Sequence, residues 1–202
     1  MFSTYSLSYW PIHRSKAKLI IAGISLLATV AFVLLGSNLN ASAQDTAAHL
    51  QPGGMLPLLA GQSLPGDPVE LPSAAEGHPT VVLFSFSRAG GQRAEEWLQH
   101  LSQEMPDIPI YSAIFLESVP GPFRGVVVSG IKSRTPQQQQ RRTILLYAKL
   151  NAWKQQLQNC DVEDVCVLLL GPDSHIRWMT GGAFSANSEQ ALGAQLRAFR
   201  HE

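Results

Sequence analysis

An uninterrupted apolar run near the start of the chain sets the first limit on how the protein can fold. Residues 19–36 (LIIAGISLLATVAFVLLG) contain no charged side chain, and Ser25 and Thr29 are their only polar side chains. As a helix, a run of this length extends about 27 Å, close to the thickness of a bilayer's hydrocarbon core. A helix buried in a soluble domain normally keeps a polar stripe. The run therefore predicts a single transmembrane helix.

Basic residues precede this run. Arg14, Lys16 and Lys18 lie on its N-terminal side, and residues 1–43 contain no acidic residue. By the positive-inside rule, residues 1–18 form a cytoplasmic segment. We therefore expect residues 19–36 to span an inner membrane once, with the remainder of the chain on the non-cytoplasmic, periplasmic side.

Two further interpretations of the N-terminal region stay open. Residues 41–43 (ASA) form a motif of the kind that signal peptidase cuts, and cleavage after Ala43 would release the remainder to the periplasm. The acid-free start is also compatible with a mitochondrial presequence and a place in the mitochondrial inner membrane. Residues 37–54, which are small and polar, are predicted to be a tether, and residues 55–202 a globular domain.

The charge of the globular part argues against a nucleic-acid ligand. The chain has 15 basic and 15 acidic residues, and three basic ones precede residue 44, so residues 44–202 have a net charge of −3. A surface that binds a phosphate backbone needs the opposite sign. Hydrophobic residues make up 45% of the chain and there are two cysteines, which excludes disordered and disulfide-dense classes.

The hydrophobic pattern predicts an α/β domain. Residues 80–87 (TVVLFSFS) are a nearly continuous apolar run, typical of a strand that is covered on both faces. The expected elements are, in order, two short strands within residues 55–71, a strand at 80–87, a helix at 92–105, a strand at 108–116, an irregular segment at 121–147, a short helix at 148–158, strands at 165–170 and 175–180, and a last helix capped by Ser185 or Asn187.

This order of elements resembles the thioredoxin superfamily, above all its peroxiredoxin and membrane-tethered thiol-reductase branches. The nearest local match is residues 81–97 (VVLFSFSRAGGQRAEEW), an apolar strand that leads into a helix. The resemblance implies a thioredoxin-like three-layer sandwich with a central mixed sheet. It also places Ala89, Gly90, Gly91 and Gln92 at the family's CxxC positions, and Val165 at the position of its cis-proline.

The cysteines that this family uses in catalysis are missing from those positions. Thiol–disulfide exchange needs a thiolate, which a helix N-terminus stabilises. Ala89 and Gln92 have no ionisable sulfur, and Ser85 and Ser87 supply no peroxidatic cysteine. Thiol chemistry at the usual site is therefore excluded. We expect a vestigial, non-catalytic site that binds an extended peptide through backbone hydrogen bonds.

A degenerate thioredoxin-like domain behind a membrane helix is also similar to the assembly factor of the F-type ATP synthase. The shared features are the FSFSRAGGQRAEEW entry to the helix, clustered arginines in the middle of the domain, and IRW at residues 176–178 followed by glycines. The resemblance implies a membrane-tethered binding module that assists the assembly of a membrane complex. Its protein client would be a subunit such as one of the ATP synthase.

Cys160 and Cys166 leave three interpretations open. They form a structural disulfide in an oxidising compartment, stay as free thiols with Cys166 buried in a strand, or act as a redox pair beside the vestigial site. The third interpretation gives the alternative function, a divergent thiol oxidoreductase or peroxiredoxin-like protein. The five-residue spacer fits neither a zinc site nor a redox CxxC motif.

No cofactor, metal ion or catalytic residue is expected. The histidines lack the spacing of metal ligands, and the GxSxG elbow of serine hydrolases is absent from the sequence. Lys132, Arg134, Arg141 and Arg142 flank a run of glutamines in the segment expected to be irregular. The pattern favours a solvated loop, and the functional alternative is contact with lipid head groups or an acidic patch of a partner.

Overall fold

The computed structural model describes residues 50–157, 160, 161 and 163–199. The predicted transmembrane helix, the possible cleavage site at Ala43 and most of the predicted tether lie outside these residues. Within them, none of the helices has the length and apolar character needed to cross a membrane.

Seven strands form one mixed sheet in the order β2-β1-β5-β4-β3-β6-β7. The three in its middle, β5, β4 and β3, run parallel to one another, and the pairs β1–β5, β1–β2, β3–β6 and β6–β7 are antiparallel. The strands are β1 (Leu59–Ser63), β2 (Pro68–Leu71), β3 (Thr80–Ser85), β4 (Ile110–Phe115), β5 (Thr143–Leu146), β6 (Val165–Leu170) and β7 (Ile176–Gly181).

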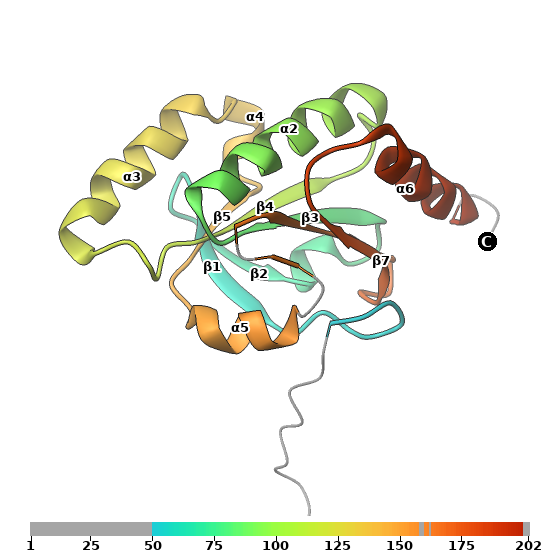
Figure 1. The fold of residues 1–202 in the computed structure, drawn as a ribbon, viewed down its shortest axis with the longest axis horizontal. Coiled ribbons are helices and arrows are strands. Elements are labelled where there is room, and N and C mark those ends of the chain that lie inside the picture. Colours follow the sequence, from blue (N-terminus) through green and yellow to red (C-terminus); the bar gives the residue numbers. More distant parts are fainter. Residues whose placement is uncertain (1–49, 158–159, 162, 200–202) are drawn as a thin grey trace, which may run out of the picture. The chain divides into compact units, whose positions relative to one another are not determined.

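Helices cover both faces of the sheet, which makes three layers (Figure 1). One face carries α2 (Arg88–Glu104), α3 (Gly121–Arg134) and α6 (Ala186–Ala198), and the other carries α5 (Leu150–Gln156). Two shorter helices, η1 (Ser73–Ala75) and α4 (Gln137–Gln140), lie between strands. The predicted three-layer α/β arrangement with a central mixed sheet is confirmed.

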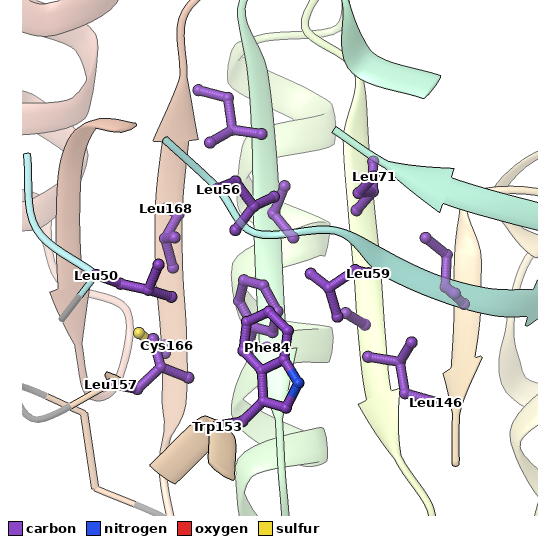
Figure 2. Packing of buried hydrophobic residues seen from close by; sticks show 14 of the residues in the cluster. Leu50, Leu56, Leu59, Leu71, Phe84, Leu146, Trp153, Leu157, Cys166 and Leu168 are labelled. Atoms are coloured by element: carbon purple, nitrogen blue, oxygen red, sulfur yellow. The ribbon is translucent and has the colours of Figure 1, made fainter. Parts of the chain in front are cut away.

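The two central strands β3 and β6 are buried along their whole length. Because side chains alternate along a strand, Val81 and Leu83 pack with α2 and α6, whereas Val82 and Phe84 pack on the α5 face. On that face Phe84 stacks on Trp153 of α5, with ring centroids 5.9 Å apart. Figure 2 shows these two rings at the centre of the cluster. Continuous apolar strands are stable here because both faces are covered.

The packed domain begins earlier than the sequence predicts. Leu50, assigned to the tether, is only 4% exposed and lies in the α5-face core beside Leu157 and Cys166 (Figure 2). Its N–H donates to the carbonyl oxygen of Gln156 at 2.8 Å, and the N–H of Gly53 donates to that of Ile176 at 2.7 Å. The boundary at residue 55 is therefore corrected: residues 50–54 belong to the domain.

The segment expected to be irregular, residues 121–147, contains α3, α4 and β5, so that prediction is wrong. Helix α3 includes Gly121, Gly125, Gly130 and three consecutive valines, all weak helix formers, and none of its side chains is fully buried. Its amphipathic pattern is correspondingly faint. Strand β5 has four residues, all of them buried. It is too short for its period to be recognised in the sequence.

The N-terminal boundary of the domain can be tested by a matched pair of substitutions. Leu50→Ala should lower the free energy of unfolding by about 2–5 kcal/mol, because it leaves a cavity in a packed core. Leu58→Ala should change it by less than about 0.5 kcal/mol, since Leu58 is 65% exposed. Urea unfolding followed by circular dichroism measures both. Equal free energies of unfolding for the two variants would show that residue 50 belongs to the tether.

Candidate functional site

The candidate site lies at one edge of the sheet, where β3, β4 and β5 end. Because these strands are parallel, the segments that follow them, including the first turn of α2, meet at this edge. Strand β6 runs the opposite way and begins there, so that Val165 pairs with Ser85. The structure thus places the first turn of α2 and Val165 at the same edge of the sheet.

Helix α2 begins at Arg88, four residues before the predicted start at residue 92. Ser87 is its N-cap residue, and the Ser87 side-chain oxygen accepts a hydrogen bond from the N–H of Gly90 at 3.1 Å. The four residues at the CxxC positions therefore form the first helical turn rather than a loop in front of it. Ala89 and Gln92 are exposed, Gly91 is half-buried and Gly90 is buried.

Gly90 packs directly against the backbone before β6. A Cβ atom at Gly90 would lie 2.5 Å from the carbonyl oxygen of Asp164, closer than real Cβ atoms come to an oxygen. A Cβ at Gly91 would meet no neighbour within 4 Å. The two adjacent glycines thus have different roles, and only Gly90 is required by the close approach of the chain.

Both backbone groups of Val165 have partners inside the domain. The N–H of Val165 donates to the Asp164 carboxylate at 2.9 Å, and its carbonyl oxygen accepts from the N–H of Gly182 at 3.1 Å. The side chain of Val165 is fully buried. An extended peptide could pair with this residue only by displacing one of these bonds. The first turn of α2 is therefore the more accessible half of the expected groove.

Two further contacts join α2 to the strands at this part of the edge. Arg93, one residue past the CxxC positions, forms an ion pair with Asp164, whose hydrogen bond and negative charge raise the pKa of the guanidinium. The indole N–H of Trp97 donates to the carbonyl oxygen of Gly182 at 3.0 Å. These contacts hold α2, the start of β6 and the end of β7 in one arrangement.

Cys160 and Cys166 are joined in a disulfide, with Cα atoms 5.5 Å apart. Cys166 is fully buried and Cys160 is half-buried. Cys166 lies in the α5-face core near Leu50 and Leu157 (Figure 2), and Cys160 packs against the same core, whereas α2 covers the opposite face. The structure therefore does not bring the cysteines to the helix N-terminus, although Cys166 directly follows Val165 in the sequence.

Two of the four predicted cations lie in a helix and two lie in a turn. Lys132 and Arg134 lie in the last turn of α3, and Arg141 and Arg142 directly follow α4. All four are exposed. Arg134 lies 3.6 Å from the carboxylate of Glu95 on α2. Among the described residues, no group of acidic residues, histidines and cysteines could hold a metal ion.

Sequence reasoning missed Asp164, Arg93 and the exposed aromatic side chains of this edge. Asp164 stands in an acidic loop with no motif, and its role depends on the Gly90 contact. Phe123 and Tyr147 lie in the segment predicted to be irregular. A usable signal was the run of valines after Phe123, which is too apolar for a solvated loop.

No protein-family model and no curated protein matches this chain. Solved structures do. A protein described as the thiol:disulfide interchange protein DsbE, from Chlorobium tepidum, has a TM-score of 0.53 at 14% identity, covering 74% of this chain and 97% of its own. The C-terminal domain of a thiol-disulfide oxidoreductase from Bacteroides thetaiotaomicron has a TM-score of 0.51 at 10% identity, covering 73% and 97%.

BsSco, a member of the Sco family of cytochrome c oxidase assembly proteins, also has a TM-score of 0.51, at 12% identity, covering 74% of this chain and 96% of its own. The chain has a thioredoxin-like fold. At these identities the likeness concerns the fold alone.

The two glycines of the first turn should respond in opposite ways to alanine. Gly90→Ala should lower the free energy of unfolding by about 1–3 kcal/mol, because its Cβ collides with the Asp164 carbonyl. Gly91→Ala should raise it by roughly 0.5–1 kcal/mol, since alanine restricts the unfolded chain and meets no neighbour. Urea unfolding measures both. Similar effects at the two positions would contradict the close approach.

Two substitutions at Asp164 should separate its hydrogen bond from its charge. Asp164→Ala leaves the buried N–H of Val165 without its acceptor and should cost about 1–3 kcal/mol. Asp164→Asn keeps an acceptor oxygen and loses only the ion pair with Arg93, which is partly exposed, so its loss should be smaller. Equal losses in urea unfolding would assign the stabilisation to the charge instead.

Proposed function

We propose that this protein is a non-catalytic, membrane-tethered, thioredoxin-like binding module that assists the assembly of a membrane protein complex. The F-type ATP synthase is the complex that the sequence resemblance suggests. The membrane anchor is the apolar run at residues 19–36, residues that the structure does not describe, and the binding part is the thioredoxin-like domain.

One observation carries this proposal. Thioredoxin-like oxidoreductases have their reactive cysteines at the start of this helix. Here Ala89 and Gln92 stand at those positions in the first turn of α2, and Cys160 and Cys166 lie on the other face of the sheet. A helix N-terminus lowers the pKa of a thiol only when the thiol is placed there. The domain thus keeps the architecture of the site and lacks the group that would react.

The first turn of α2 is the surface that we assign to the client. In open α/β sheets, ligands bind at the carboxyl ends of the parallel strands. Ala89, Gly91 and Gln92 present an accessible, uncharged turn at this edge, with open space above Gly91. Because the backbone groups of Val165 are already paired, the client contacts the helix turn rather than adding a strand to β6.

We propose the assembly role by analogy with one structural neighbour. BsSco, similar in fold, belongs to a family of cytochrome c oxidase assembly proteins. A tethered domain meets a membrane-bound client at high effective concentration, so a modest intrinsic affinity is sufficient for such a role.

The disulfide favours a second candidate function, a divergent thiol oxidoreductase that uses Cys160 and Cys166. Exchange requires a thiolate to reach one of the two sulfurs, and Cys160 is the partly exposed one. Against this function, the disulfide is packed in the α5-face core and receives no stabilisation from the start of α2. We rank it below the binding module.

Site-specific photo-crosslinking in intact membranes tests the binding module. A benzophenone side chain at Ala89 of the full chain should crosslink to a subunit of a membrane complex. The same group at Leu58, which is also exposed but precedes β1 instead of lying in α2, should not. Gly91→Trp should weaken the Ala89 crosslink several-fold without unfolding the domain, since the site above Gly91 is open.

Two results would count against the proposal. The first is equal crosslinking from Ala89 and Leu58, which would indicate contact by proximity alone. The second is turnover of a disulfide substrate by the full chain that is lost in Cys160→Ser. That result would establish the oxidoreductase instead. Adding cysteines through Ala89→Cys and Gln92→Cys supplies a positive control for the redox assay.

A further inference from the structure

Helix α3 presents an apolar flank that nothing in the described chain covers. Phe123 is 62% exposed and Val126 is 73% exposed, although both are large and apolar. The neighbouring flank of the helix, Val127, Val128 and Ile131, packs on the sheet. Each of three glycines in α3 has open space where a Cβ atom would stand. Packing therefore does not require glycine there, although glycine lowers the stability of a helix.

The segment of the chain that contains this helix is basic. Residues 118–149 contain six basic side chains and no acidic one, whereas the remainder of residues 44–202 has a net charge of −9. Four of the cations gather at the end of α3, because Gln140 Nε2 donates to the carbonyl oxygens of Lys132 at 3.4 Å and Thr135 at 3.2 Å. This contact holds Arg141 and Arg142 next to the last turn of α3, beside which Figure 1 shows α4.

We infer that α3 lies along the surface of a bilayer that contains anionic phospholipids. We call the residues that touch it the α3 surface: Phe123, Val126, Lys132, Arg134, Arg141 and Arg142. Phe123 and Val126, the exposed apolar side chains, enter the boundary between head groups and acyl chains, and the cations bind the phosphates. Each basic residue near such a surface contributes roughly fivefold in affinity. The inference rests on the membrane tether of the proposed function.

The distances allow this arrangement. Residues 37–49 join the apolar run to Leu50, and extended they reach about 45 Å. A domain of about 150 residues is roughly 40 Å across. The chain can therefore place α3 on the bilayer even though Leu50 packs on the other face of the sheet.

A lipid surface fits these residues better than a protein does. The core of a protein interface is depleted of charged residues and is rich in packed aromatic anchors. On the side of the domain that carries α3, exposed cations lie at the end of α3 and directly after α4, and α3 has one exposed aromatic side chain, Phe123. Since Arg134 lies beside Glu95 of α2, the client-binding turn of α2 would also be held close to the membrane.

A fluorescent label at residue 123 tests the contact. The full chain with Phe123→Cys, in which the native cysteines stay in their disulfide, is labelled with NBD and reconstituted into nanodiscs. In discs of phosphatidylcholine and phosphatidylglycerol in equal parts, NBD emission should shift to the blue, and spin-labelled lipid should quench it. Both effects should fall in discs of phosphatidylcholine alone, and at high salt because salt screens the charges.

Matched variants make the result decisive. Label at Leu58→Cys, with similar exposure, should show neither effect. Joint replacement of Lys132, Arg134, Arg141 and Arg142 by Gln should reduce quenching at residue 123 to the Leu58 level. Val126→Cys repeats the measurement if Phe123→Cys does not fold.

Quenching that is absent, or equal in both lipid compositions, would overturn the lipid contact. Crosslinks from residue 123 to a protein, without quenching by lipid, would likewise overturn it and assign the α3 surface to a protein partner. The Ala89 crosslink tests the client separately, so the two proposals can fail independently.

Discussion

The burial of β3 and β6 on both faces is the constraint on which the other elements depend. Neither strand has an exposed residue, so helices must cover both sides of the sheet. Phe84 and Cys166 pair across these strands and face α5, whereas Leu83 and Val167 face α2 and α6. The two cores thus form on either side of one pair of strands. The first turn of α2 and the disulfide are both placed by their positions relative to that pair.

The contact of Gly90 with Asp164 then limits the chemistry of the edge where β3, β4 and β5 end. The close approach of the two backbones leaves no room for a side chain at Gly90, and the Asp164 carboxylate holds Val165 from the other side. A reactive thiol and an accessible partner strand are both missing from the described residues of this edge. Such an edge suits recognition through the exposed turn of α2 rather than exchange chemistry.

The domain separates its disulfide from its accessible surfaces by placing them on opposite faces of the sheet. The disulfide joins Cys160 to a fully buried cysteine on the α5 face, where it ties the loop before β6 to the core. The opposite face carries α2 and α3, the helices with accessible turns and cations. The proposed binding module with a structural disulfide accounts for both observations, and it keeps the proposed membrane contact of α3 compatible with the proposed client binding at α2.

The sequence by itself determined six of the seven described strands and the missing thiols. Apolar runs such as residues 165–170 are long enough to identify a buried strand, and the absence of cysteine at Ala89 and Gln92 is a matter of composition. It could not reveal α3 or β5, because weak helix formers and a four-residue strand leave too little periodicity. Only the tertiary structure decided that Gly90 and Asp164 touch and that Cys166 faces away from α2. Those facts depend on which side of a strand a residue points to and on how closely two distant segments approach, and neither is encoded in local sequence.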